Sequence, residues 1–179
     1  KGSLLWGHSL GGHVAINVAL KRDDLKVVNF GMTPLETLAD IGPVMTPVPE
    51  FAGFQSSDRT KDSMIGFLNY SALGEQEKLE ELLTCALEQD PHFNTTFFTS
   101  GIENYSWGEV TKAKKLGDRF YLVISRNEKI YNYEAMMRLP LNLIRFDYVG
   151  HTPWLHDSSW AQKIKKEILN SNYSSANLQ

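Results

Sequence analysis

The chain has 179 residues, of which 42% are hydrophobic and 22% charged, and its formal net charge is −3. This length allows one globular domain with a sizeable core, and the absence of a basic run argues against nucleic acid or an acidic membrane surface as a partner. The single cysteine, Cys85, excludes an internal disulfide and fits a reducing compartment, so we expect a cytoplasmic protein. No apolar run is long enough to span a bilayer, and no signal peptide opens the chain.

The first predicted element is a strand that leads into Gly7-His8-Ser9-Leu10-Gly11-Gly12, and a helix-compatible run follows from Val14 to Leu20. A Gly-x-Ser-x-Gly sequence between a strand and a helix is the pattern of a nucleophile elbow, a sharp turn that exposes the serine Oγ. The alternative interpretation is an ordinary turn between a strand and a helix. The strand before it and the helix after it favour the elbow.

The small residues around Ser9 have a predicted steric role. We expect side chains at Gly7 and Gly11 to collide as the strand and the helix fold close together, and Gly12 to let the helix lie near the sheet. The helix N-terminus directs N–H groups and a partial positive charge at the turn, where an oxyanion would be stabilised.

After the first helix, the sequence predicts a second strand of the sheet and then a helical insertion. Residues 26–30 read as a short buried strand, which a short connection makes parallel to the first. Residues 34–58 read as an irregular excursion, and helices are predicted at 57–68, at 74–88 and around Phe93 to Phe98. We interpret residues 35–105 as a helical cap; the alternative is a separate small helical bundle.

The second half predicts further strands and helices of the same sheet. Ser106 and Glu109 have the spacing of a capping box, which predicts a helix to about Leu116. The remaining predictions are a strand at 120–124, a helix at 130–138, a strand at 141–148 and a helix from Ser158 or Ser159. Residues 1–34 and 106–169 would form the core, and the polar tail 170–179 would be flexible.

Three predicted strand ends carry groups that suit nucleophilic catalysis, in the chain order Ser9, Glu128, His151. A serine hydroxyl is a weak nucleophile until a base removes its proton, and the unperturbed pKa of histidine suits that task. Glu128 would orient the imidazole and stabilise the imidazolium. Asp40, in the excursion after the second strand, is the alternative acid.

These residues resemble the C-terminal part of an α/β-hydrolase. The elbow sequence, the segment Gly150-His151-Thr152-Pro153 and the strand 120–124 with its following loop are similar to the family's elbow, histidine loop and acid loop. The resemblance implies a mostly parallel sheet flanked by helices with a helical cap, Ser9 as nucleophile, His151 as general base and acid, and the Leu10 N–H as an oxyanion donor. It places Glu128 at the acid position, although the family's loop usually carries a glycine where this chain has Ser125-Arg126.

The resemblance also implies that the family's first strands, and the loop with the second oxyanion donor, would precede Lys1. We therefore expect the chain alone to be inactive and poorly stable.

The function predicted from these residues is a serine hydrolase that cleaves a small or medium ester, amide or thioester through an acyl-enzyme. Alternatives are an acyltransferase, C–C hydrolase or perhydrolase with the same triad, and a non-catalytic protein that binds a ligand or partner. The expected partner is a small-molecule substrate, with no cofactor and no metal, since no two histidines show ligand spacing. Candidate substrate-binding residues are His8, which is also a candidate for packing at the elbow, Met32, Thr33 and Trp154.

Overall fold

The computed structural model describes residues 3–55, 59–72 and 76–176. The chain divides into two compact units. The first comprises Lys1–Thr46, Trp107–Tyr148 and Asp157–Gln179, and the second comprises Pro47–Ser106 and Val149–His156. Among the described residues, none of the helices combines the length and the apolar character that crossing a membrane requires.

A parallel sheet forms the centre of the first unit. Its strands are β1 (Ser3–His8), β2 (Leu25–Phe30), β3 (Phe120–Ile124) and β4 (Leu143–Arg145), which pair in the order β1-β2-β3-β4. All three pairings are parallel, as predicted. The carboxyl ends of the strands therefore lie at one edge of the sheet, where the segments after β1, β2 and β3 begin.

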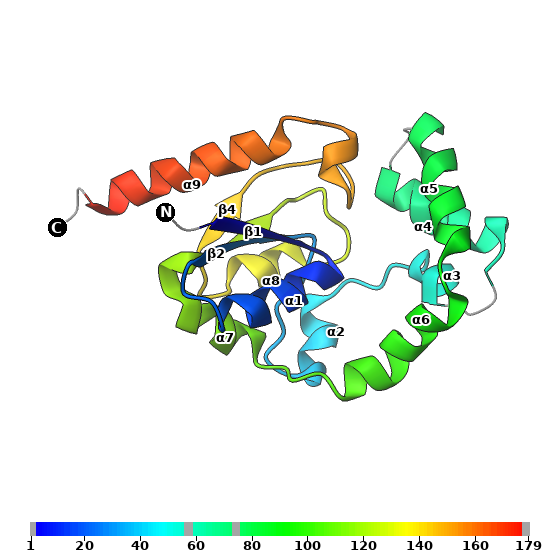
Figure 1. The fold of residues 1–179 in the computed structure, drawn as a ribbon, viewed down its shortest axis with the longest axis horizontal. Helices are drawn as coiled ribbons and strands as arrows, with labels where there is room; N and C mark the ends of the chain where they lie inside the picture. The colour runs from blue at the N-terminus through cyan, green and yellow to red at the C-terminus, as the bar shows by residue number, and fades with distance from the viewer. Residues whose placement is uncertain (1–2, 56–58, 73–75, 177–179) are drawn as a thin grey trace. The chain divides into compact units, whose positions relative to one another are not determined.

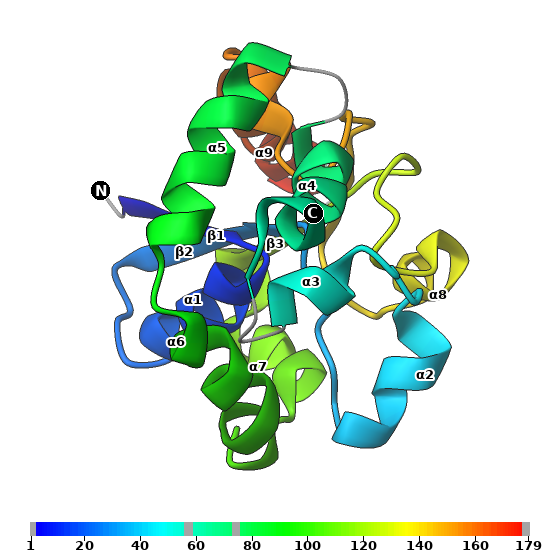
Figure 2. The same cartoon turned by 90° about the vertical axis from the view of Figure 1, so that its right-hand side faces the viewer.

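Helices cover both faces of this sheet (Figures 1 and 2). One face carries α9 (Trp160–Ala176), whose Trp160, Ile164 and Ile168 recur every four residues and pack on a buried cluster that includes Val28 and Tyr121. The other face carries α1 (Leu10–Ala19) and α7 (Glu109–Leu116). Shorter helical segments of the unit are η1 (Leu38–Asp40), α2 (Ile41–Val44), η3 (Gly117–Arg119) and α8 (Tyr133–Met137).

The second unit is helical. It contains α3 (Phe51–Gln55), α4 (Lys61–Ala72), α5 (Gln76–Glu88), α6 (Pro91–Thr96), the π-helical turn η2 (Phe97–Gly101) and the short 3-10 turn η4 (Pro153–Leu155). Its small core joins Met64 and Leu68 of α4 to Leu79 and Leu83 of α5. The predicted helices at 57–68 and 74–88 correspond to α4 and α5, and their first residues lie partly outside the described ones.

The predicted capping box at Ser106 is wrong. Helix α7 begins at Glu109, and its N-cap is Gly108, with a φ of 84°, a value that suits glycine. The Glu109 carboxylate is fully buried and accepts a hydrogen bond from the backbone N of Leu35 at 3.0 Å. The Glu109 side chain therefore bonds to Leu35, which is distant in sequence, and does not cap the helix as the local pattern had predicted.

Three other predicted boundaries differ from the structure. The helix expected at 130–138 is only α8, because Tyr131 forms an antiparallel bridge with Met45 and Asn132 accepts a capping bond from Ala135 N. The strand expected at 141–148 is only β4, and the last helix continues to Ala176, beyond the expected end of the core at residue 169. No proline or glycine interrupts residues 160–176, so nothing in the sequence ends the helix at 170.

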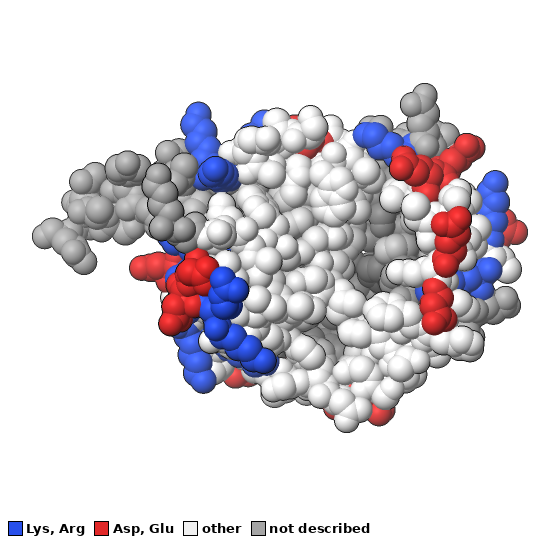
Figure 3. Space-filling view, viewed as in Figure 1, with Lys and Arg blue, Asp and Glu red and all other residues white. Residues whose placement is uncertain are grey.

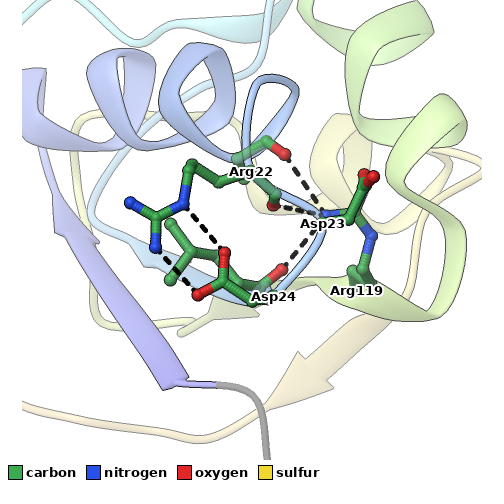
Figure 4. A network of polar contacts seen from close by, with 6 residues as sticks. Arg22, Asp23, Asp24 and Arg119 are labelled. Carbon is green, nitrogen blue, oxygen red and sulfur yellow. Dashed lines mark hydrogen bonds and ion pairs between the residues drawn. The ribbon is translucent and has the colours of Figure 1, made fainter.

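A charged network closes the turn between α1 and β2 (Figure 4). The Arg119 guanidinium Nη1 donates to the carbonyls of Ala19, Arg22 and Leu25 at 3.2, 2.9 and 3.3 Å. Beside it, Arg22 forms a two-bond pair with Asp24, at 2.8 Å in each bond, that keeps the pKa of the carboxyl below its ordinary value.

On the face shown in Figure 3, charged side chains occur in small groups of mixed sign.

Candidate functional site

Ser9 occupies the turn between β1 and α1 in a strained backbone conformation. Its φ is 49° and its ψ −124°, and it is the one non-glycine residue with a positive φ among the described residues. Such a conformation costs of order 1–3 kcal/mol, and it persists only where neighbouring contacts impose it. The Ser9 backbone N donates to Phe30 O at 3.0 Å, and Ser9 O accepts from Gly12 N at 2.9 Å. A serine with a positive φ therefore connects the parallel strand β1 directly to helix α1.

Close packing under the turn explains two of its glycines. A Cβ on Gly7 would lie 2.3 Å from Asn29 Oδ1 and 2.7 Å from the Cα of Gly12, and a Cβ on Gly12 would lie 2.7 Å from Met32 Sδ. The expected collision at Gly11 is wrong, because a Cβ there would meet nothing within 4 Å. Gly11 is exposed, on the side of α1 that faces away from the sheet.

Asn29 links the strand to the helix at this point. It is fully buried, and its Nδ2 donates to Gly12 O at 2.9 Å and to Met32 Sδ at 3.0 Å. Asn29 was not among the predicted site residues, although a polar side chain inside an apolar strand is a usable signal of a specific contact. Its position fixes the first turn of α1 and so the backbone on one side of Ser9.

A second, partly buried link fastens α1 from the side of α7. His13 Nδ1 lies 2.5 Å from Glu109 Oε1, while Glu109 Oε2 and N bond to the backbone of Leu35. Glu109 therefore holds α1, α7 and the segment after β2 together. The sequence offers no local signal for this pair, because its members are 96 residues apart.

Glu128 lies in the loop after β3 and is 3% exposed. Its Oε1 accepts hydrogen bonds from the backbone N of Lys129 at 3.0 Å and of Ile130 at 3.3 Å. The two amide N–H groups therefore hold this carboxylate oxygen in place within the loop. Burial raises the pKa of the Tyr131 and Tyr148 phenols, and the nearby negative Glu128 raises it further, so both phenols stay protonated.

Asp40 has a different environment. Its Oδ2 accepts from Thr37 N at 2.6 Å and from Thr37 Oγ1 at 3.1 Å, as the acidic member of a capping box on η1. This local role accounts for its presence without catalysis.

His151 belongs to the second unit and is 3% exposed. Its ring stacks on Tyr70 of α4, with the ring centroids 6.2 Å apart and the planes 25° apart. It follows Gly150, whose φ is 66°. In the same segment, Trp154 is 41% exposed and the backbone O of Leu155 accepts a hydrogen bond from Lys78 Nζ of α5.

The other predicted binding residues lie close to the carboxyl ends of β1 and β2. The His8 ring stacks on Phe30, with centroids 5.0 Å apart, which fits the packing role proposed for it. Met32 is buried against Gly12, and Thr33 is 3% exposed. The buried Thr33 hydroxyl has no hydrogen-bond partner within the described residues. The described residues contain no group of three or more metal-binding side chains.

Comparisons with solved structures identify proteins of the same fold. The N-acyl homoserine lactonase AidH, in a mutant complexed with N-hexanoyl homoserine, superposes with a TM-score of 0.76 at 14% identity, and the match covers 95% of this chain and 63% of that one. The meta-cleavage product hydrolase CumD of Pseudomonas fluorescens IP01 gives 0.61 at 15% identity, covering 96% of this chain and 66% of that one. The 2-hydroxy-6-oxo-6-phenylhexa-2,4-dienoate hydrolase BphD of Rhodococcus sp. strain RHA1 gives 0.66 at 16%, covering 95% and 64%.

This chain therefore spans a little under two thirds of the length of these neighbours. No family model matches the sequence, and no curated protein matches it.

Proposed function

The chain has the α/β-hydrolase fold, and from that premise we propose that it is a serine hydrolase that cleaves an ester, amide or thioester through an acyl-enzyme. The observation that carries the proposal is the strained Ser9 between a parallel strand and a helix. An ordinary turn between a strand and a helix does not require a positive φ at a serine. In a nucleophile elbow, this strained conformation exposes the serine hydroxyl.

The proposed reaction has two halves. In the first, Ser9 Oγ attacks the substrate carbonyl carbon while His151 accepts the hydroxyl proton, and the Leu10 N–H at the start of α1 stabilises the oxyanion. His151 then gives the proton to the leaving alcohol, amine or thiol as the bond to the carbonyl carbon breaks. In the second half, water attacks the acyl-enzyme, its proton passes through His151 to Ser9, and the carboxylic acid leaves.

Glu128 is the proposed acid of the triad. It is buried and two amides hold its carboxylate, whereas Asp40 is engaged by the capping box on η1. A buried carboxylate would hold the imidazole tautomer and stabilise the imidazolium during proton transfer. We therefore assign the acid to Glu128 and a structural role to Asp40.

The proposed binding residues are Met32 and Thr33 after β2, with His8 and Trp154. The Thr33 hydroxyl is suited to a polar group of the substrate, because a buried hydroxyl without a partner costs about 1–3 kcal/mol. A lactone or another small acyl compound fits this assignment, given the N-acyl homoserine complexes of the lactonase neighbour. The meta-cleavage hydrolases among the neighbours favour one alternative, hydrolysis of a C–C bond next to a ketone with the same residues.

Labelling with a fluorophosphonate probe tests the nucleophile. The reaction forms one covalent bond per chain and needs no turnover, so it detects even a slow nucleophile. We expect labelling of the wild-type chain that is lost in Ser9→Ala and kept in Ser159→Ala, a control at an exposed serine. Undiminished labelling of Ser9→Ala would remove Ser9 from the mechanism.

Product analysis separates the two substrate classes. A panel of lactones and simple esters, set against vinylogous diketones of the meta-cleavage type, would be offered to the wild type and to Ser9→Ala. Ser9-dependent release of an acid and an alcohol supports the acyl-enzyme proposal, and Ser9-dependent cleavage of the diketones alone supports C–C hydrolysis.

A further inference from the structure

We propose that Ser125 is a positioning residue that couples the segment carrying Glu128 to the segment carrying His151. This inference rests on the proposed function, since it concerns two members of the proposed triad. Ser125 stands where the family resemblance leads one to expect a glycine, so the resemblance itself assigns it no role.

The Ser125 side chain joins two segments at the carboxyl ends of β3 and β4. Its Oγ donates to Tyr148 O at 3.1 Å and accepts from Tyr148 N, also at 3.1 Å. The same oxygen accepts from Asn127 N at 3.1 Å. Ser125 is fully buried, so water does not compete for these bonds.

The bond pattern extends the strand pairing beyond β3 and β4. Phe146 N donates to Ile124 O at 3.0 Å, and Arg126 N donates to Asp147 Oδ1 at 3.0 Å. The Ser125 hydroxyl bonds to Tyr148, the residue that directly precedes the Val149–His156 stretch of the second unit. The two segments therefore leave the sheet with a fixed register.

The acid loop is closed by a second hydroxyl. Tyr131 Oη accepts from Ser125 N at 2.8 Å and donates to Ser125 O at 3.3 Å. This closes residues 125–131 into a ring whose middle residue is Glu128. Because burial keeps the Tyr131 phenol protonated, it remains able to donate.

The hydrogen bonds between Ser125 and Tyr148 lie close along the chain to both Glu128 and His151. Glu128 lies three residues after Ser125, and His151 lies three residues after Tyr148. Three residues of extended chain span at most about 10 Å, so both side chains start within a short reach of one hydroxyl. Misplacement of a catalytic group by about 1 Å can cost on the order of 10²-fold in rate, so a tie at this point bears on catalysis.

The experiment compares Ser125→Ala with the conservative Ser125→Thr and with Ser159→Ala as a control. Amide hydrogen exchange at Asn127 and Tyr148 reports the tie directly, because both N–H groups donate to the hydroxyl. We expect exchange there to be about 2- to 10-fold faster in Ser125→Ala, as the loss of one hydrogen bond predicts, and close to the wild-type rate in Ser125→Thr.

Proton NMR and labelling report the consequence for the site. An imidazole N–H that donates to a carboxylate resonates far downfield of the amides, and the structure predicts one such proton from the His13–Glu109 pair. We expect a second, identified by its loss in Glu128→Gln. This second resonance should move or vanish in Ser125→Ala, while the His13 resonance stays, and fluorophosphonate labelling should slow about tenfold or more. Ser125→Thr should restore both.

The outcomes separate this inference from the proposed function. Faster exchange in Ser125→Ala with an unchanged second resonance and an unchanged labelling rate would make the hydroxyl purely structural and overturn the proposal. A wild-type chain without the second resonance would also overturn it, by removing the link between Glu128 and His151. Loss of labelling in Ser9→Ala would still support the nucleophile in either case.

Discussion

The two adjacent glycines of α1 have opposite predicted responses to alanine. An alanine at either position should gain about 0.5–1 kcal/mol of helix propensity. At Gly11 nothing opposes this gain, since the added Cβ meets nothing within 4 Å. At Gly12 the Cβ would lie 2.7 Å from Met32 Sδ and 2.9 Å from Met32 Cγ, and overpacking of this kind costs about 1–3 kcal/mol. We therefore expect Gly12→Ala to be less stable than Gly11→Ala by about 1–3 kcal/mol.

Thermal unfolding followed by circular dichroism measures the difference. At this chain length, 1 kcal/mol corresponds to about 2–4 °C in Tm, so Gly11→Ala should unfold slightly above the wild type and Gly12→Ala several degrees below Gly11→Ala. The double change Gly12→Ala with Met32→Ala is the control, because removal of the Met32 side chain relieves the clash and should lower Tm by less than the two single effects added together. Equal Tm values for the two single variants would refute the packing argument.

Three further predictions concern separate contacts. Glu109→Ala should destabilise the chain by about 2–4 kcal/mol in urea unfolding, because it leaves a buried backbone N–H and a histidine without their acceptor; a loss below 0.5 kcal/mol would contradict that role. Arg119→Met should lower the urea midpoint, since three carbonyls lose their donor, whereas Arg22→Met at an exposed pair should leave it nearly unchanged. Glu128→Gln should reduce fluorophosphonate labelling about 10²-fold or more and Asp40→Asn less than threefold, and the reverse order would make Asp40 the acid.

Features that depend on neighbours in sequence could be predicted from it. The strand, turn and helix around Ser9 follow from an apolar run, a Gly-x-Ser-x-Gly pattern and a helix-forming run, which are all local. The same holds for α5, whose Leu79 and Leu83 recur with the period of a helix and pack with Met64 and Leu68. The parallel pairing of β1 and β2 followed from the short connection between them.

Features that depend on partners distant in sequence could not be predicted from the sequence. The spacing of Ser106 and Glu109 fits a capping box, but Glu109 bonds to Leu35 and His13, which lie 74 and 96 residues away. Ser125 was treated as a departure from a glycine-containing loop, and only the pairing beyond β4 places its hydroxyl against Tyr148. The short range of α8 has the same origin, because Tyr131 pairs with Met45 instead of joining the helix.

The strained backbone conformation of Ser9 must be stabilised by neighbouring contacts, and several separate contacts around the turn do so. A cost of order 1–3 kcal/mol is comparable to one or two buried hydrogen bonds, so a single tie would leave the turn able to relax. Here the backbone of Phe30 holds the Ser9 amide, Asn29 holds the carbonyl of Gly12 in α1, and Glu109 holds the side chain of His13, the next residue. Each fixes a different part of the turn or of α1, so the loss of any one leaves the positive φ imposed by the others. Substitutions at Asn29 and Glu109 should therefore be more than additive in their effect on the placement of Ser9, even though each also lowers stability by itself. A double-mutant cycle on the labelling rate measures that coupling.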